Sequence, residues 1–184
     1  LCLNNSPITM LVYWGGISGA DATHLCTFDI PLISNIPNMV YLAPTNKEEY
    51  LAMIEWGLQQ DKHPVVIRIP GNAVVSTKET IEPDFYNLNT YKKVNEGSEI
   101  AILGLGSFFE LGKKVQAKLK EELNIYATLI NPRFISGVDE DMLNSLLENH
   151  KLVITLEDGV LDGGFGEKIS RFYSDKDMKV LNFG

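Results

Sequence analysis

Residues 99–122 read EIAILGLGSFFELGKKVQAKLKEE, an apolar run followed by a glycine turn and then by an amphipathic stretch. The run at 99–103 is short and almost continuously apolar, which is typical of a strand covered on both faces. The stretch at 108–122 has helical spacing, and Ser107 and Glu110 stand at the spacing of a capping box. A buried strand that leads directly into a helix is the repeating unit of parallel α/β folds, so this stretch predicts an α/β protein.

The same alternation continues on both sides of this stretch. Further strands are predicted at 9–13, 39–42, 64–69, 127–130, 151–156 and 179–181. Further helices are predicted at 45–60 (with Thr45 and Glu48 at capping-box spacing), at 140–148 behind Asp139, and at 167–173. Residues 71–98 are polar with scattered aliphatics and predict a long connector. We therefore predict two three-layer α/β units with mostly parallel sheets, over residues 1–75 and 94–184, joined by a linker at 76–93.

Composition excludes several classes of protein. The 184 residues are 45% hydrophobic, and 16 Lys and Arg stand against 24 Asp and Glu, a net charge of −8. This acidity argues against nucleic acid or an anionic membrane as the main partner, and no apolar run is long enough to span a bilayer. The two cysteines suit a reducing compartment, so we expect a cytoplasmic location. The chain opens on Leu1 without a start Met, and we expect it to be a piece of a longer polypeptide.

Two glycine-rich turns are weak candidates for phosphate binding. Gly104-Leu105-Gly106 lies between a strand and a helix, but the third glycine of a dinucleotide fingerprint is replaced by Phe109. Residues 163–166 read GGFG and follow Glu157 and Asp158, whose negative charges would repel a phosphate. Both motifs are therefore more often structural turns than nucleotide sites.

The sequence gives little support for a metal site or for a hydrolase. His24 and Cys26 are the only close His/Cys pair, and His63 and His150 stand alone in the sequence. Because a zinc site needs three or four ligands at recurring spacings, we predict no dedicated metal site. The sequence also lacks a Gly-x-Ser-x-Gly nucleophile elbow.

The strongest candidate site is the stretch 13–24, which reads YWGGISGADATH. It follows a predicted buried strand, contains three glycines, and places Asp21 and His24 three residues apart. Loops at the carboxyl ends of parallel strands commonly carry the functional residues of α/β folds, and a His near an Asp can transfer protons near neutral pH. The alternative is a structural loop whose Asp caps a helix beginning near Phe28. The spacing alone favours neither interpretation.

Short motifs along almost the whole chain resemble 1-deoxy-D-xylulose-5-phosphate synthase, a member of the transketolase-like, thiamine-diphosphate-dependent enzymes. The motifs, in order, are GADATH (19–24), FD (28–29), IPNM (36–39), APT (43–45), RIPGN (68–72), RF (133–134), VD (138–139), LE (156–157) and GGFG (163–166). The resemblance implies that residues 1–75 are the latter part of a pyrimidine-binding domain. It implies that residues 94–184 are a C-terminal transketolase domain.

The resemblance also implies an activity. The family joins a pyruvate-derived acyl unit, after loss of CO₂, to glyceraldehyde 3-phosphate, and the product feeds isoprenoid and thiamine synthesis. The implied cofactors are thiamine diphosphate and Mg²⁺, bound mainly by parts absent from this chain, and the implied assembly is a homodimer. His24 is implied as a catalytic residue, and Asp21 and Arg68 as substrate-binding residues. The 184 residues alone are expected to be inactive.

Two departures from the family pattern concern the acceptor phosphate. Trp14 stands where the family carries an arginine. RIPGN (68–72) lacks the second arginine of the family's Arg-Tyr-Pro-Arg-Gly-Asn pattern, so only Arg68 matches. Loss of two guanidinium groups removes strong bidentate contacts, so either other groups bind the phosphate or the acceptor differs. The alternatives are a transketolase, a 2-oxoacid dehydrogenase β-type subunit, a non-catalytic dimerisation module, and a flavodoxin-like nucleotide binder.

Overall fold

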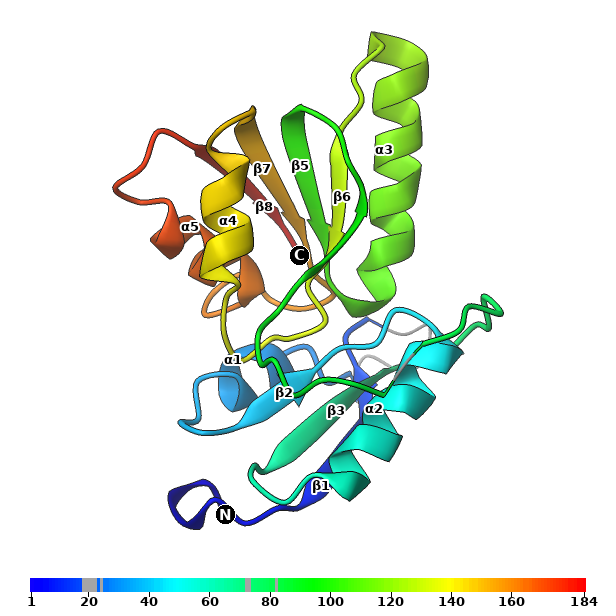
Figure 1. Ribbon diagram of the computed structural model, residues 1–184, viewed down its shortest axis with the longest axis vertical. Coiled ribbons are helices and arrows are strands. Elements are labelled where there is room, and N and C mark those ends of the chain that lie inside the picture. The colour runs from blue at the N-terminus through cyan, green and yellow to red at the C-terminus, as the bar shows by residue number, and fades with distance from the viewer. Residues whose placement is uncertain (18–22, 24, 72–73, 82) are drawn as a thin grey trace.

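The structure of the chain is a computed structural model that describes residues 1–17, 23, 25–71, 74–81 and 83–184. Its strands form two sheets, stacked along the long axis of the molecule (Figure 1). The first sheet is wholly parallel and has the strand order β1-β3-β2. The elements of this first unit are η1 (Cys2–Asn4, a 3-10 helix), β1 (Thr9–Gly15), α1 (Asp29–Ile33), β2 (Val40–Leu42), α2 (Lys47–Gln59) and β3 (Val65–Pro70).

The second sheet has the order β4-β6-β5-β7-β8, and only β4 is antiparallel to its neighbour. Helix α3 covers one face of this sheet, and α4 and α5 cover the other (Figure 1). The elements of this second unit are β4 (Lys92–Asn95), β5 (Glu99–Gly104), η3 (Gly106–Phe108, a 3-10 helix), α3 (Phe109–Leu123), β6 (Thr128–Asn131), α4 (Glu140–Leu146), β7 (His150–Leu156), α5 (Phe165–Phe172) and β8 (Lys179–Phe183).

The predicted fold class is confirmed, since the chain is a mixed α/β protein with two mostly parallel sheets. Each strand predicted from an apolar run is present, with its ends shifted by at most two residues. Strand β4 was not predicted and begins inside the expected linker. All four of its residues are exposed, so this edge strand buries no apolar side chain that the sequence would reveal.

Two of the three predicted helix caps are wrong. Helix α2 is capped by Asn46, whose Oδ1 accepts a hydrogen bond from the Glu49 amide (2.8 Å), and not by Thr45. Ser107 does not cap α3, because residues 106–108 form a 3-10 turn first and its hydroxyl bonds elsewhere. The cap of α4 is confirmed: Asp139 Oδ1 accepts from the Met142 amide at 2.9 Å. Each error shifts the helix start by one or two residues.

The two units share one hydrophobic core. Buried side chains of the first sheet, such as Tyr41 and Val66, belong to the same apolar cluster as Leu103 and Ile135 of the second unit. The main chain also crosses the junction, since the Ile135 amide donates to the Tyr41 carbonyl at 2.7 Å. A separate cluster between α2 and the other face of the first sheet is centred on Trp56. The two sheets are therefore held together by apolar packing and by main-chain pairing.

Candidate active site

The carboxyl ends of the strands of both sheets meet at the junction between the two units. A Cβ atom placed on Gly106, after β5, would lie 3.3 Å from Cβ of Ala43, which follows β2. The segment after β7 likewise lies against the segment after β1, since the Ile17 amide donates to Asp158 Oδ1 at 2.6 Å. This is where parallel α/β folds place their binding sites, so the junction is the candidate active site.

An ion pair between Arg68 and Asp29 is buried at this junction. Arg68 Nε lies 2.6 Å from Asp29 Oδ2, Nη2 lies 3.1 Å from Oδ1, and the two side chains are only 3% and 0% exposed. The Tyr41 hydroxyl donates to the same Asp29 oxygen. Burial acts to lower the pKa of Arg68, but the hydrogen bond and the charge of Asp29 outweigh it, so the pKa lies above its usual value. Burial and the charge of Asp29 raise the pKa of Tyr41. Arg68 therefore stays charged, and Tyr41 stays a neutral donor.

Asp158 connects this ion pair to the loop that follows β1. Its carboxylate accepts from the Ile17 amide on Oδ1 (2.6 Å) and from the Ser107 hydroxyl on Oδ2 (3.0 Å). Its main-chain carbonyl accepts from Arg68 Nη2. Gly16 has φ +91°, and a Cβ at this position would overlap the Asp158 carboxylate. Glycine is therefore required at position 16 both by the backbone conformation and by this close approach.

Main-chain hydrogen bonds join the two ends of the loop that follows β1. The Gly16 amide donates to the Cys26 carbonyl at 2.9 Å, and the Cys26 amide donates to the Trp14 carbonyl at 3.2 Å. The side chain of Cys26 lies half-buried beside this pairing. Burial and the charge of Asp29 raise the pKa of the Cys26 thiol, so it is held in the protonated form and is a poor nucleophile.

The glycine turn at 163–166 already holds an anion of its own chain. The carboxylate of fully buried Glu157 accepts from the amides of Phe165 (2.8 Å) and Gly166 (2.7 Å), at the first turn of α5. Burial raises the pKa of Glu157, and these two hydrogen bonds act against that rise. Because these amides are the donors that a phosphate would use, the turn has a structural role, as its sequence favoured.

The predicted site residues fall into two groups. Asp21 and His24 lie outside the residues that the structure describes. Arg68 is described, and it is 2% exposed with its guanidinium bonded to Asp29 and to the Asp158 carbonyl. The described hydrogen-bond partners of Arg68 all belong to the protein itself. Trp14, the first departure from the family pattern, is 43% exposed and has φ 60°.

Sequence reasoning missed the roles of Asp29, Tyr41 and Asp158. Asp29 is 39 residues from Arg68, and Asp158 is 90 residues from it, so no local spacing connects them. The motifs FD (28–29) and LEDG (156–159) were the available signals, since an acidic residue directly beside an apolar strand or helix must find a partner when buried.

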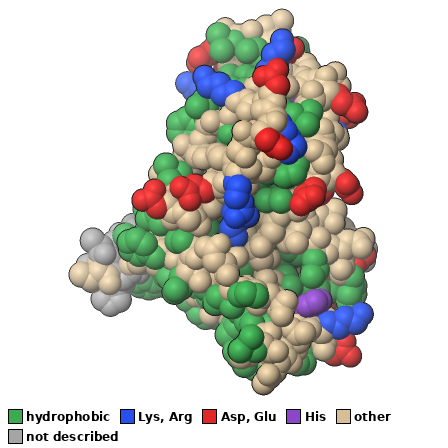
Figure 2. All heavy atoms as spheres, turned by 90° about the vertical axis from the view of Figure 1, so that its left-hand side faces the viewer, with side chains coloured by type: hydrophobic (Ala, Val, Ile, Leu, Met, Phe, Trp, Pro, Cys, Tyr) green, Lys and Arg blue, Asp and Glu red, His purple; other side chains and the backbone are tan. Residues whose placement is uncertain are grey.

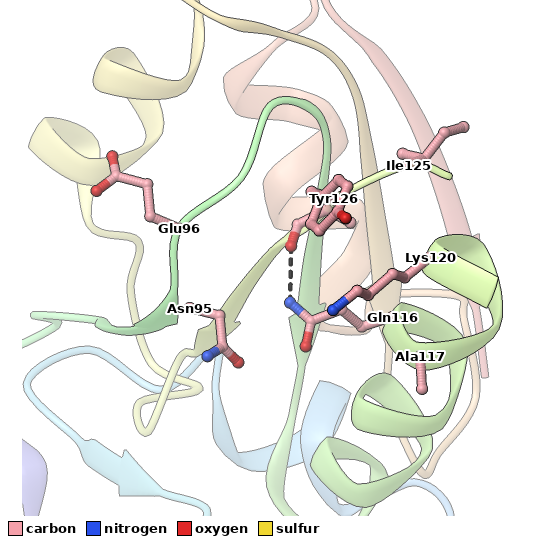
Figure 3. Close-up of a pocket in the computed structure, with 8 residues that line it drawn as sticks. Asn95, Glu96, Gln116, Ala117, Lys120, Ile125 and Tyr126 are labelled. Atoms are coloured by element: carbon pink, nitrogen blue, oxygen red, sulfur yellow. Dashed lines mark hydrogen bonds between the residues drawn. The ribbon is translucent and has the colours of Figure 1, made fainter. Parts of the chain in front are cut away.

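A hollow of about 360 Å³ lies away from the junction, between α3 and the start of β6 (Figure 3). In it Gln116 Nε2 donates to the Ala127 carbonyl at 2.7 Å. Residues 126 and 127 precede β6, so this hollow lies at the amino edge of the parallel strands, opposite the candidate site. In the described part of the chain, no group of three or more His, Cys, Asp and Glu residues is placed to hold a metal ion. No described helix is long and apolar enough to cross a membrane.

Comparison with known proteins identifies the family. Residues 89–184, just over half of the chain, match the family model "Transketolase, C-terminal domain". The chain belongs to the transketolase C-terminal domain family. The matched range begins three residues before β4 and contains the whole second sheet, so the family domain is the second unit.

Curated relatives match the transketolase-like chain from end to end. It is 33% identical over 188 residues to the 1-deoxy-D-xylulose-5-phosphate synthase of Clostridium tetani, covering 100% of this chain and 30% of the relative. It is 33% identical over 189 residues to the enzyme of the same name from Francisella tularensis, covering 100% of this chain and 29% of the relative. The chain thus spans about 30% of the length of these curated relatives.

Solved structures share the fold. A split-gene transketolase, described as an inactive beta4 tetramer, superposes with a TM-score of 0.81 at 21% identity, over 99% of this chain and 58% of that one. A transketolase of Pichia stipitis complexed with sedoheptulose 7-phosphate gives a TM-score of 0.73 at 15% identity, over 100% of this chain and 26% of that one. At these identities the likeness shows the fold of both units and no more.

Proposed function

We propose that this chain works as the C-terminal part of a thiamine-diphosphate-dependent transferase of the 1-deoxy-D-xylulose-5-phosphate synthase type. The observation that carries the proposal is the match of curated synthases over 100% of the chain, since both units, and not only the family domain, are included. In the proposed reaction an acyl unit from pyruvate, after loss of CO₂, is joined to glyceraldehyde 3-phosphate. The product is 1-deoxy-D-xylulose 5-phosphate, a precursor for isoprenoid and thiamine synthesis.

In this proposal, residues 1–75 are the latter part of a pyrimidine-binding domain, residues 76–93 a linker, and residues 94–184 the C-terminal transketolase domain. The loop after β1 faces the substrates, with Asp21 binding a sugar hydroxyl and His24 orienting substrate or moving a proton. Arg68 adds positive charge behind the loop, and its bonds to Asp29 and Asp158 support a role in shaping the site rather than in direct contact.

The described residues do not fit a diphosphate–Mg²⁺ site. No suitable group of acidic side chains is present among them, and the amides at the start of α5 already bind Glu157. We therefore propose that thiamine diphosphate and Mg²⁺ are bound mainly by parts of the enzyme outside these 184 residues. When bound, the cofactor supplies the carbanion chemistry, and this chain contributes substrate binding and proton positions. We further propose a cytoplasmic homodimer.

The test is an assay of the complete enzyme, in which this chain acts with the polypeptide that supplies the cofactor site. With thiamine diphosphate, Mg²⁺, pyruvate and glyceraldehyde 3-phosphate, we expect CO₂ release and formation of 1-deoxy-D-xylulose 5-phosphate in equal amounts. Turnover of ketose phosphates without any use of pyruvate would identify a transketolase instead. An intact oligomer that turns over neither substrate pair would identify an association module.

The acceptor is tested in the same assay. Because Trp14 replaces one phosphate-binding arginine of the family pattern and the second is missing near Arg68, unphosphorylated glyceraldehyde is the informative comparison. If other groups bind the phosphate, kcat/KM for glyceraldehyde 3-phosphate exceeds that for glyceraldehyde by at least tenfold. Equal values would show that the enzyme does not recognise the acceptor phosphate.

A further inference from the structure

The side chain of Lys168, on α5, joins the two units through its amine. Its Nζ donates to the Ser34 carbonyl at 3.0 Å and to the Ile135 carbonyl at 3.2 Å. Ser34 is the C-cap residue of α1 in the first unit, and Ile135 follows β6 in the second. Within the described part of the chain, no carboxylate forms an ion pair with Nζ. The amine is therefore half-buried at the junction without a counter-ion in contact.

Lys168 also lines a hollow of about 340 Å³ between the end of α1 and the start of α5. Asn35 lines it from the first unit, and the glycine turn before α5 lines it with main chain alone. The carboxylate of Glu167 accepts from the Gly163 amide at 2.7 Å, beside the hollow. Because Glu167 and Arg171 are both exposed, a small molecule can reach the hollow from solvent.

The surroundings of this amine favour its neutral form. Burial lowers the pKa of Lys168 to about 8, the charge of Arg171 acts in the same direction, and that of Glu157 acts against it. At pH 8 about half of the Lys168 side chains are thus uncharged, against about one in 250 for a lysine of ordinary pKa. A desolvated lysine beside another cation is an activated nucleophile.

The two hydrogen bonds leave the neutral amine with a free lone pair. A neutral amine has two N–H groups and one lone pair, and the carbonyls of Ser34 and Ile135, which can only accept, occupy the two N–H groups. The lone pair then points away from both carbonyls, and the hollow that Lys168 lines supplies the space for an electrophile. The contacts that hold the nitrogen in place therefore leave it able to react.

We propose that Lys168 is a modification site, at which the amine is acylated by a small acyl phosphate bound in the hollow. Nζ attacks the acyl carbon, and the bond from this carbon to the bridging phosphate oxygen breaks. The phosphate leaves with the electron pair of that bond and takes up the proton that the nitrogen loses. The products are N-acyl lysine and hydrogen phosphate. Arg171 supplies a cation for the phosphate group at the rim of the hollow.

The experiment treats the folded protein with acetyl phosphate and measures the acetylated fraction of each lysine against time by mass spectrometry. Lys114 and Lys118, exposed lysines of α3, are controls in the same digest. The reaction is run between pH 6.5 and pH 9.5, where circular dichroism shows the protein folded, and is repeated on the chain unfolded in urea. Lys168→Arg is the matched variant, since it keeps the charge and the hydrogen-bond donors but has no nucleophilic amine.

At pH 8 we expect Lys168 of the folded protein to react at least about fivefold faster than Lys114 and Lys118, and within about twofold of them in urea. Its rate in the folded protein should level off above about pH 8.5, because the amine is then mostly uncharged. In the unfolded chain its rate should keep rising over the same range. The first acetyl group that wild type acquires should be missing in Lys168→Arg.

A folded-state rate at Lys168 no faster than that of the two controls would overturn the proposal, and so would a rate that keeps rising to pH 9.5. With p-nitrophenyl acetate, a neutral acyl donor, the advantage of Lys168 over the controls should be smaller. An equal advantage with both donors would show that the hollow does not recognise the phosphate, and would exclude an acyl phosphate as its ligand. If Lys168→Arg does not fold, the wild-type digest alone decides. None of these measurements depends on the activity of the complete enzyme.

Discussion

At the scale of single residues, burial decides what Arg68 can do. Its guanidinium lies beside a fully buried Asp29 that also accepts from the Tyr41 hydroxyl. Removing one partner of a buried ion pair leaves the other charged and desolvated, which is far more costly than losing an exposed pair. Arg68, which matches a substrate-binding arginine of the family in sequence, therefore stabilises the fold of this chain through its ion pair with Asp29.

Arg68→Ala should lower the free energy of unfolding by about 3–5 kcal/mol, because Asp29 would remain buried without its partner. Urea denaturation measures the change, and Arg171→Ala, at an exposed arginine of α5, is the control with an expected change within about 0.5 kcal/mol. A loss below about 1 kcal/mol for Arg68→Ala, together with a raised KM in the complete enzyme, would instead favour direct substrate binding.

His150 is a second buried residue with a fixed hydrogen-bonding role. Its Nδ1 lies 3.2 Å from the Leu146 carbonyl, which can only accept, so this nitrogen carries the proton. Its Nε2, 2.8 Å from Thr128 Oγ1, then accepts from that hydroxyl, which itself accepts from the Gly97 amide at 2.9 Å. Burial lowers the pKa of His150, because the charged form is poorly solvated there.

Stability should therefore fall as the pH drops below the ordinary histidine pKa of about 6.5. Between that value and the lowered pKa of folded His150, the unfolded chain binds the extra proton and the folded chain does not, so acid favours unfolding. Urea denaturation at pH 7.5 and pH 5 measures the effect, which should be smaller in His150→Gln and unchanged in His63→Gln. Equal pH dependence in all three proteins would show that His150 is not the group responsible.

At the scale of elements, apolar periodicity located the buried strands but not the helix ends. The strands at 64–69 and 99–103 were predictable because both faces of a parallel sheet are covered, which leaves an almost continuous apolar run. The strand at 9–13 was found from the same kind of run, but it is an edge strand and none of its residues 9–13 is buried. The cap of α2 was not predictable, because the sequence offers two capping boxes one residue apart. One pairs Thr45 with Glu48, and the other pairs Asn46 with Glu49. The structure uses the second, and the Glu49 carboxylate also accepts from the Thr45 amide at 2.8 Å.

Asn46→Ala should lower the free energy of unfolding by about 1 kcal/mol, because the Glu49 amide loses its acceptor at the start of α2. Lys47→Ala is the control, since Lys47 is exposed and alanine is the best helix former, so no loss is expected. Thermal or urea denaturation measures the stability of the two variants against wild type. An Asn46→Ala variant as stable as wild type would mean that Asn46 is not the cap.

The candidate site was predictable only in part, because local sequence patterns do not determine every contact that forms it. The loop after β1 stands out because glycines and a His/Asp pair follow an apolar strand within 12 residues. The structural role of the turn at 163–166 follows from the acidic Glu157 before it. The contacts that Arg68 makes with Asp29 and Asp158, and the Ile17–Asp158 hydrogen bond, join residues 39 to 141 positions apart. Such pairs depend on how the two sheets meet, which no local pattern encodes.

At the scale of the whole molecule, the junction between the units is part of the core and not a hinge between independent domains. The apolar cluster that contains Tyr41 and Val66 also contains Leu103 and Ile135. Hydrophobic side chains are also gathered at the surface over the lower part of the face shown in Figure 2. A groove of about 450 Å³ lies over the same apolar cluster, lined by Leu1, Cys2, Leu3, Met10, Val12, Ile33, Ile36, Met39 and Val66.

Because the units share a core, the chain should unfold in a single cooperative transition. Differential scanning calorimetry should give equal calorimetric and van't Hoff enthalpies, and circular dichroism and tryptophan fluorescence should report the same midpoint. The fluorescence reports only the first unit, since both tryptophans, Trp14 and Trp56, lie there. Two separated transitions, or different midpoints for the two probes, would show that the units are independent.

We propose that the loop after β1 is the substrate site of a synthase-type enzyme, and His24→Ala in the complete enzyme tests this proposal most directly. If His24 positions substrate or transfers a proton, kcat/KM should fall by about 10²- to 10⁴-fold. The melting temperature should stay at the wild-type value, because this role involves the substrate and not the core. His63→Ala, at a histidine of the first unit outside the site, should leave kcat/KM unchanged. A wild-type kcat/KM in His24→Ala, with a clearly lower melting temperature, would contradict a role of His24 in the reaction.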